Sequence, residues 1–136
     1  MSKSIPKEIR KKVYEKYGGR CAYCGCKLEY KNMQVDHIDA VYRAKYEGRQ
    51  VDNSIDNYMP ACRQCNFYKG TSTIEEFRRK IVHLEETVFN RFTVRLALKY
   101  GILRFRRWGQ TFYFEYPPIP DFGDKIEIIH INTNAD

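Results

Sequence analysis

Two pairs of cysteines in this chain of 136 residues have the spacing of metal ligands. Cys21 and Cys24 form one C-x-x-C pair, and Cys62 and Cys65 form the other. Each pair can present two thiolates from a tight turn, and together they make the tetrahedral four-sulfur set that Zn²⁺ accepts in closed structural sites. Such a site leaves no coordination position open, so we expect a zinc ion that stabilises the fold and takes no part in a reaction.

The fifth cysteine, Cys26, could replace Cys24 as a ligand. The step from Cys24 to Gly25 suits a tight metal-binding turn better, so we interpret Cys26 as a nearby free thiol. Reduced core cysteines are the plain alternative, but two regular pairs argue against it. A redox function is also disfavoured, because neither pair has the strand-then-helix context of a thioredoxin-like site.

A carboxylate, an imidazole and two carboxamides accompany the cysteines, namely Asp36, His37, Asn57 and Asn66. Asp36 and His37 are neighbours on an expected strand, so their side chains point to opposite faces unless the strand bends. Asn66 directly follows a cysteine ligand, so a bound zinc would fix its position. An imidazole with a pKa of about 6.5 can take a proton from water at neutral pH. The cluster is therefore a candidate hydrolytic site.

Taken together, these residues resemble the HNH endonuclease family, and more closely its zinc-stabilised members with the ββα-metal fold. The resemblance covers about residues 6–72 and is specific because it rests on a combination of motifs. These motifs are Cys21-x-x-Cys24-Gly25, Asp36-His37-Ile38, Asn57, and Cys62-x-x-Cys65-Asn66-x-x-Lys69-Gly70.

The resemblance implies a role for each polar residue of the cluster. Asp36 and Asn66 would bind the catalytic divalent cation, Mg²⁺ or Mn²⁺, and His37 would be the general base that activates water. Asn57 would pin the loop between the two strands and help to orient His37. Asn53 is a rival for that role, although Asn57 has the family-like distance of nine residues to Asn66. The last position of the motif is Asn in place of His, so this is an H-N-N variant, and its products would carry 5′-phosphate and 3′-hydroxyl ends.

Hydrophobic periodicity and helix-ending residues predict the elements that must position this site. The expected helices cover residues 6–17, 63–69, 73–88 and 92–100, with Thr73 or Ser72 as the cap of the third. The expected strands are 31–38, a short one near 41–42, a C-terminal hairpin of 102–107 and 111–116, and a last strand at 125–131.

These elements predict an α+β protein. Its ββα-metal nuclease core would be stapled by the four-cysteine zinc site and followed by a C-terminal helix and β-hairpin extension. We expect residues 1–73 to form the nuclease domain and residues 74–136 to form an extension that contacts DNA or a protein partner.

The charge of the chain points to a polyanionic partner. Lys and Arg outnumber Asp and Glu by 24 to 17, which gives a net charge of +7 and favours nucleic acid over a membrane. Arg104, Arg106 and Arg107 are candidate nucleic-acid contacts in the expected hairpin, and Lys69 is another. A half-buried sheet with long basic side chains outside is the alternative for the hairpin. The expected partner is DNA, with RNA left open, and the protein is expected to be a monomer or a homodimer.

No secretory signal begins the sequence, and no stretch approaches the roughly 18 apolar residues of a membrane span. We therefore expect a cytoplasmic protein of the bacterial or phage-type intracellular kind. The expected function is a metal-dependent HNH endonuclease that hydrolyses DNA phosphodiester bonds, with His37 as the base and one cation on Asp36 and Asn66. Two alternatives remain: a non-catalytic, zinc-stabilised nucleic-acid-binding module, and a protein-interaction factor that uses the C-terminal hairpin.

Overall fold

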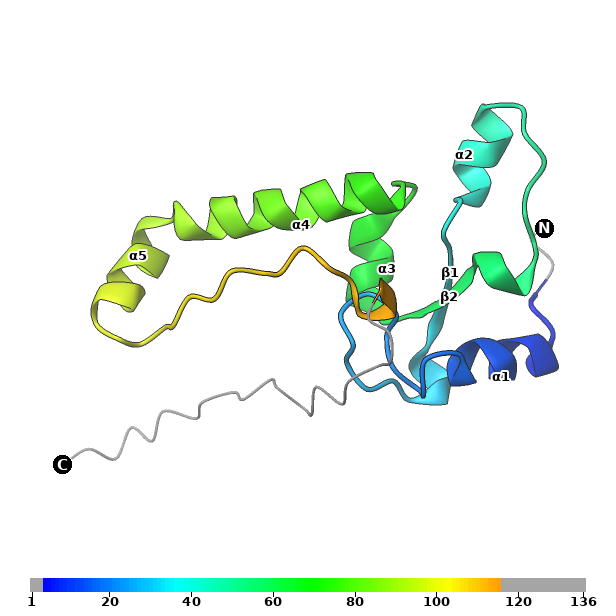
Figure 1. Ribbon diagram of the computed structural model, residues 1–136, viewed down its shortest axis with the longest axis horizontal. Coiled ribbons are helices and arrows are strands. Elements are labelled where there is room, and N and C mark those ends of the chain that lie inside the picture. Colours follow the sequence, from blue (N-terminus) through cyan, green and yellow to red (C-terminus); the bar gives the residue numbers. More distant parts are fainter. Residues whose placement is uncertain (1–3, 116–136) are drawn as a thin grey trace.

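A two-stranded sheet packs against a short helix, in the right half of the view in Figure 1. The computed structural model describes residues 4–115. Strand β1 (Gln34–His37) pairs with β2 (Tyr58–Ala61) in antiparallel register, which sets Asp36 opposite Met59 and His37 opposite Tyr58. Helix α3 (Arg63–Lys69) begins two residues after β2 and packs back onto β1. The predicted ββα unit is therefore present.

The other described elements surround this unit or lead away from it. Helix α1 lies beside the sheet, α2 is inserted between the strands, and α4 carries α5 away from the core, after which the chain returns along α4 (Figure 1). Their bounds are Lys7–Glu15 for α1, Val41–Tyr46 for α2, Ile74–Phe89 for α4 and Phe92–Lys99 for α5, with 3₁₀ turns at Tyr30–Asn32, Ile55–Asn57 and Tyr113–Glu115. None of the described helices has the length and apolar character that crossing a membrane requires.

The helix boundaries follow the capping residues in the sequence. Thr73 caps α4 in a capping box, because its Oγ1 accepts from the Glu76 amide at 3.1 Å while the Glu76 carboxylate accepts from the Thr73 amide at 3.0 Å. Gly70, with a φ of 54°, follows the last residue of α3. The helices predicted at 6–17, 63–69, 73–88 and 92–100 are confirmed, each within two residues at its ends.

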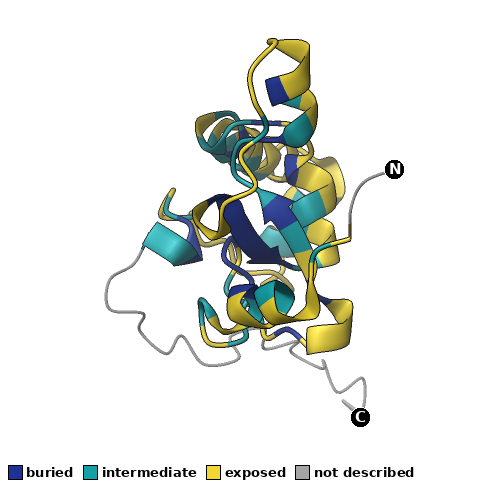
Figure 2. Cartoon of the chain, turned by 90° about the vertical axis from the view of Figure 1, so that its right-hand side faces the viewer, coloured by how far each residue is buried: buried dark blue, intermediate teal, exposed yellow. Residues whose placement is uncertain are grey.

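The strand predicted near residues 41–42 is wrong. This segment begins helix α2, with Ala44 completely buried and Tyr42 stacked on Tyr46 at 6.4 Å between ring centroids. The strand that pairs with β1 is β2 instead, which is buried along its whole length (Figure 2). It contains Pro60, a residue that lowers the expectation of a strand, but both strands of a two-stranded sheet are edges and an edge tolerates proline.

The predicted C-terminal hairpin is also wrong within the described residues. Residues 102–112 contain no regular element, and a 3₁₀ turn follows at Tyr113–Glu115. The alternating apolar residues pack individually instead of pairing as strands: Phe105 contacts Phe89 at 5.1 Å between ring centroids, and Trp108 contacts Phe112 at 5.2 Å. The strand predicted at 125–131 lies outside the described residues.

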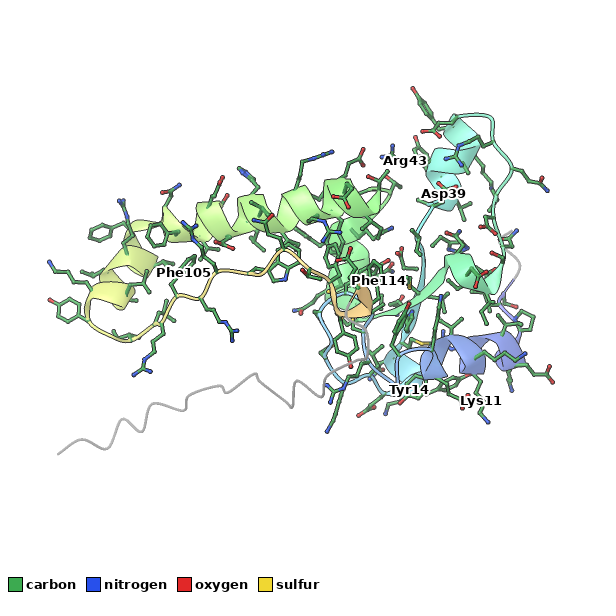
Figure 3. All side chains as sticks on the ribbon, in the orientation of Figure 1. Lys11, Tyr14, Asp39, Arg43, Phe105 and Phe114 are labelled. Carbon is green, nitrogen blue, oxygen red and sulfur yellow. The ribbon has the colours of Figure 1, made fainter. Side chains whose placement is uncertain are left out.

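One hydrophobic core joins the two halves of the chain. Phe77 of α4 and Phe112 of the returning segment belong to the same buried cluster as Tyr23 and Met33. The segment is held by backbone hydrogen bonds from Tyr113 and Phe114 to the carbonyls of Tyr23 and Ala22, at 3.0 and 2.8 Å. Phe114, labelled in Figure 3, packs against this core. The boundary proposed at residue 73 therefore does not separate two cores.

Replacement of Phe112 by alanine is expected to destabilise the whole protein. Phe112 is 2% exposed, stacks on Phe77 with 5.0 Å between ring centroids, and lies under the Arg78 guanidinium. Removing such a ring costs about 3–5 kcal/mol of unfolding free energy. The matched control is Phe92→Ala, since Phe92 is 71% exposed and should change stability by less than about 0.5 kcal/mol. Urea unfolding measures both, and equal stability of the two variants would contradict the shared core.

Candidate metal centres and active site

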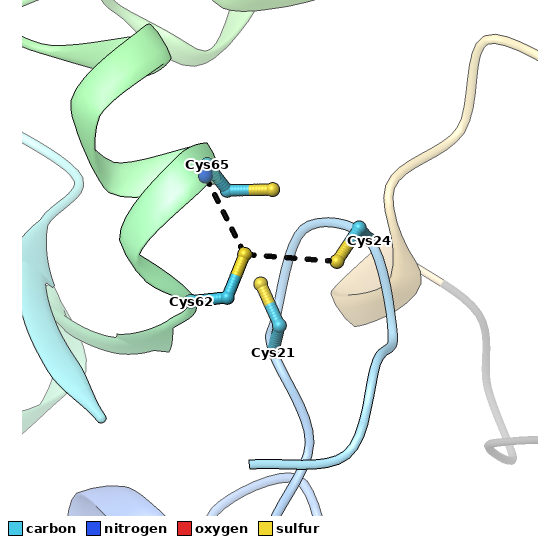
Figure 4. A group of neighbouring side chains, drawn as sticks. All are labelled: Cys21, Cys24, Cys62 and Cys65. Atoms are coloured by element: carbon cyan, nitrogen blue, oxygen red, sulfur yellow. Dashed lines mark hydrogen bonds between the residues drawn. The ribbon is translucent and has the colours of Figure 1, made fainter. Parts of the chain in front are cut away.

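Four thiols converge at a position between the turn after α1 and the start of α3 (Figure 4). The sulfur atoms of Cys21, Cys24, Cys62 and Cys65 all lie within 4.8 Å of one another, and those of Cys24 and Cys62 are 3.9 Å apart. Four sulfurs placed about 2.3 Å from a tetrahedral ion would be about 3.8 Å apart. The arrangement therefore fits one zinc ion, and Cys26 is outside this set.

The protonation of these thiols also favours a cation at their centre. Hydrogen bonds among the thiols, that with Cys24 first, lower the pKa of Cys21, and the hydrogen bond with Cys21 raises the pKa of Cys24. Ionisation of one thiol therefore disfavours ionisation of its neighbour. A divalent cation would supply the charge that lets all four bind as thiolates.

The turn that carries the first cysteine pair requires glycine. Gly25 has a φ of 78°, and a Cβ atom at this position would lie 2.7 Å from the ring of Tyr113. Its amide donates to the Cys21 carbonyl at 2.9 Å. The returning segment thus closes directly over the turn of the predicted zinc site.

Asp36 is buried, with 6% exposure, and its carboxylate is held on one side. The Tyr23 hydroxyl donates to Asp36 Oδ2, and the Lys69 ammonium lies 3.0 Å from the same oxygen. Burial raises the pKa of Tyr23, so this hydroxyl keeps the proton that it donates. Among the described residues, Asp36 Oδ1 has no hydrogen-bond or ion-pair partner. One oxygen of the carboxylate is therefore positioned and the other is available.

Lys69 is completely buried, which does not agree with its prediction as a nucleic-acid contact. Its ammonium pairs with Asp36 and donates to the His37 carbonyl at 3.0 Å. The side chain points into the interface between α3 and β1, because α3 turns this face toward the strand. It therefore positions Asp36 and offers no surface to a phosphate.

His37 is the last residue of β1 and is half-buried. Its ring contacts Tyr58 of the neighbouring strand edge to face, with 4.9 Å between centroids. Asp36 points toward Tyr23 and α3, so the two neighbours use opposite faces, as a regular strand requires. Burial is the main cause that lowers the pKa of His37, and the nearby Asp36 carboxylate opposes it. The imidazole is therefore neutral at pH 7 and can accept a proton.

Asn57 ties together the two ends of the long loop between the strands. Its side-chain oxygen accepts from the Asp39 amide at 2.8 Å, and its nitrogen donates to the carbonyls of Asp39 and Asp52 at 3.2 and 2.9 Å. Asn53, the alternative considered for this role, is exposed, and its side chain has no hydrogen bond to the described residues. The loop contact therefore belongs to Asn57.

Asn66 lies on α3 one turn before Lys69 and on the same helix face. Because Lys69 reaches Asp36, this face is the one turned toward β1. Asn66 is half-buried, and within the described chain its side chain has no hydrogen-bond partner. Its predicted role as a cation ligand stays a prediction.

Sequence reasoning missed Tyr23, which lies between Cys21 and Cys24 in the sequence and reaches the carboxylate of Asp36. Its place inside the C-x-x-C turn was visible, but the direction of its ring was not. The other predicted contacts, Arg104, Arg106 and Arg107, are exposed on the returning segment and belong to neither cluster.

Comparison with known proteins identifies the class of this domain. Residues 21–72 match the family model described as HNH endonuclease. This segment, which carries both cysteine pairs and Asp36, His37, Asn57 and Asn66, is an HNH endonuclease domain.

Two curated relatives agree with this class. Over 53 residues the chain is 38% identical to "CRISPR-associated endonuclease Cas9" of Corynebacterium diphtheriae, a match that covers 39% of this chain and 4% of that protein. Over 68 residues it is 28% identical to "SPbeta prophage-derived putative HNH endonuclease YoqL" of Bacillus subtilis, covering 48% of this chain and 30% of the relative. The matches thus span less than a third of either relative.

One solved structure is also similar, the type II-C Cas9 enzyme from Actinomyces naeslundii. The match has a TM-score of 0.47 and 24% sequence identity, and it covers 59% of this chain and 9% of the other.

Proposed function

We propose that this protein is a metal-dependent HNH endonuclease that hydrolyses phosphodiester bonds in DNA. In this proposal His37 is the general base, and Asp36 and Asn66 hold one Mg²⁺ or Mn²⁺ ion. The observation that carries it is the state of the Asp36 carboxylate, which is buried and held through Oδ2 with Oδ1 left available. Asn66 offers a second oxygen from the facing helix, and oxygen ligands suit these hard cations.

Each residue of the site has a separate role in the proposed hydrolysis. His37 takes a proton from the attacking water, and its neutral form at pH 7 suits that task. When bound, the divalent cation would stabilise the negative charge that develops on the phosphate and help the 3′ oxygen to leave. Tyr23 and Lys69 position Asp36, and Asn57 holds the loop that leaves β1 directly after His37. The products would carry 5′-phosphate and 3′-hydroxyl ends.

The ion pair of Asp36 with Lys69 is the observation that favours a second candidate function. An ammonium 3.0 Å from the carboxylate already neutralises its charge, and this would weaken the attraction for a cation. In a zinc-stabilised nucleic-acid-binding module without a catalytic metal, this ion pair with Lys69 would be enough to neutralise the buried Asp36 carboxylate. Measurement of divalent-cation binding separates the two functions.

The zinc-loaded protein is expected to bind one exchangeable Mn²⁺ ion through Asp36. Asp36→Asn should abolish this binding in a calorimetric titration, because it removes a charged ligand. Tyr23→Phe keeps the aromatic packing but loses the hydroxyl, and loss of such a supporting hydrogen bond weakens metal binding about 10–100-fold.

Asp56→Asn is the matched control, since Asp56 is an exposed acid of the same loop and should leave the titration unchanged. Zinc content and thermal stability of each variant establish that the fold survives. Equal Mn²⁺ affinity in the wild type and in Asp36→Asn would reject Asp36 as the ligand and support the non-catalytic function.

A further inference from the structure

A stretch of twenty residues, 91–110, contains six basic side chains and no acidic one. It comprises α5 and most of the returning segment, and we call it the basic arm. Its cations, all exposed, are Arg91, Arg95, Lys99, Arg104, Arg106 and Arg107. Glu85 and Glu86, near the end of α4, are the acids closest to the arm in the sequence before it. Two acidic side chains against six basic ones leave a net positive charge in this region.

The side chains of these six cations make no hydrogen bond or ion pair within the described chain, in contrast to three arginines elsewhere in the fold. Arg78 binds Glu75 and Glu115, Arg43 binds Glu76, and Arg49 binds Asp39, each with a closest contact of 3.1 Å or less. Those arginines connect elements of the fold. The arm cations serve no such purpose, so their charge remains available to a partner.

Figure 1 shows α5 far from the sheet, and the returning segment runs from it along α4 toward α3. Phe105 packs on Phe89 near the end of α4 (Figure 3), and the Trp108 amide donates to Glu85 at 3.1 Å. The 16 residues of α4 span about 24 Å.

The other end of α4 is fastened close to the candidate active site. Arg43 of α2 donates to the Thr71 carbonyl at 3.1 Å and to Glu76 at 2.6 Å, and α2 begins four residues after His37. At about 3.4 Å for each base-pair step, the length of α4 corresponds to roughly seven base pairs of duplex DNA.

We propose that the basic arm binds the phosphate backbone of duplex DNA on one side of the cleaved bond, about five to seven base pairs from it. None of the six cations of the arm is hydrogen-bonded to an acid of the described chain, and this suits the regular polyanion of a DNA backbone. A protein partner would have to be strongly acidic to match it. The distance from the cut rests on the proposed function, whereas binding by the arm does not.

The triple variant Arg104→Gln, Arg106→Gln, Arg107→Gln tests the arm by binding alone. Fluorescence anisotropy with a labelled duplex is measured over a range of salt concentrations, without Mg²⁺, so that no DNA is cut. Each lost phosphate contact lowers the slope of log affinity against log salt by about one, so the variant should lose about two to three units of slope.

The matched control replaces three exposed lysines of α1, in Lys7→Gln, Lys11→Gln, Lys12→Gln, and has the same change of net charge. It should keep most of the slope. An equal loss in both variants would overturn the proposal, because binding would then follow net charge and not the arm. An unchanged slope in the arm variant, with loss of a dimer in sedimentation, would overturn it in favour of a protein interface.

Cleavage then tests the distance. Duplexes are shortened one base pair at a time on one side of the mapped cut, and KM is measured for the wild type and the arm variant. KM should rise for the wild type when fewer than about five to seven base pairs remain on the arm side, and the arm variant should not respond. A wild-type KM that is independent of length on both sides would overturn the placement. If the protein cuts no DNA, the proposed function fails, and the anisotropy result still decides whether the arm binds.

Discussion

Cys62→Ser is expected to leave the protein unfolded at room temperature. A structural zinc ion contributes about 10–16 kcal/mol of folding free energy, which equals or exceeds the total stability of about 5–15 kcal/mol that is usual for a domain. Cys62 also caps α3, since its sulfur accepts from the Cys65 amide at 3.4 Å. Far-ultraviolet circular dichroism and metal analysis measure the result, and the wild type should contain one zinc per chain.

Cys26→Ser is the matched control, because Cys26 lies beside the four-thiol cluster without belonging to it. This variant should keep its zinc and its fold. A folded Cys62→Ser protein with the wild-type melting temperature would contradict the structural role of the metal. Loss of zinc from Cys26→Ser would place the fifth cysteine among the ligands.

His37→Ala is expected to reduce the rate of DNA cleavage at saturating metal by about 10²–10⁴-fold, which is the usual contribution of a general base. The histidine side chain is half-buried at the end of β1, so the fold, the zinc and the Mn²⁺ site should survive its removal. Single-turnover cleavage of a plasmid measures the rate of the chemical step.

The pH dependence of the rate adds a second test of this base. Burial lowers the pKa of His37 from its ordinary value of about 6.5, so the imidazole stays neutral down to a more acidic pH. The wild-type rate should therefore be constant near neutral pH and fall only below about pH 6.5.

His83→Ala is the matched control, since His83 is an exposed histidine of α4, with 80% side-chain exposure. It should keep both the rate and the pH profile. Undiminished cleavage by His37→Ala would reject His37 as the base, and an equal loss in His83→Ala would point to a general effect on the protein.

The sequence was informative wherever local chemistry decides the structure. Metal-ligand spacing identified the four cysteines, and the cap at Thr73 and the stop at Gly70 fixed helix boundaries, because these signals act within a few residues. The ββα unit followed from the family resemblance that the combined motifs carry.

Contacts between distant segments could not be predicted in this way. Whether residues 102–116 form a hairpin depends on the presence of Phe77 and Tyr23 as alternative partners for Phe112. The burial of Lys69 depends on the side of α3 that packs against β1, and one sequence position does not reveal that. Tyr23 was missed for a similar reason, since its hydroxyl meets a residue 13 positions away across the core.

Cleavage of supercoiled plasmid DNA by the zinc-loaded wild-type protein tests the central claim most directly. Incubation with Mg²⁺ or Mn²⁺ should convert the plasmid to nicked or linear DNA with 5′-phosphate ends, and the same protein in buffer without added divalent cation should leave it intact. Intact plasmid at every metal concentration, with a folded protein that is bound to the DNA, would contradict the endonuclease function.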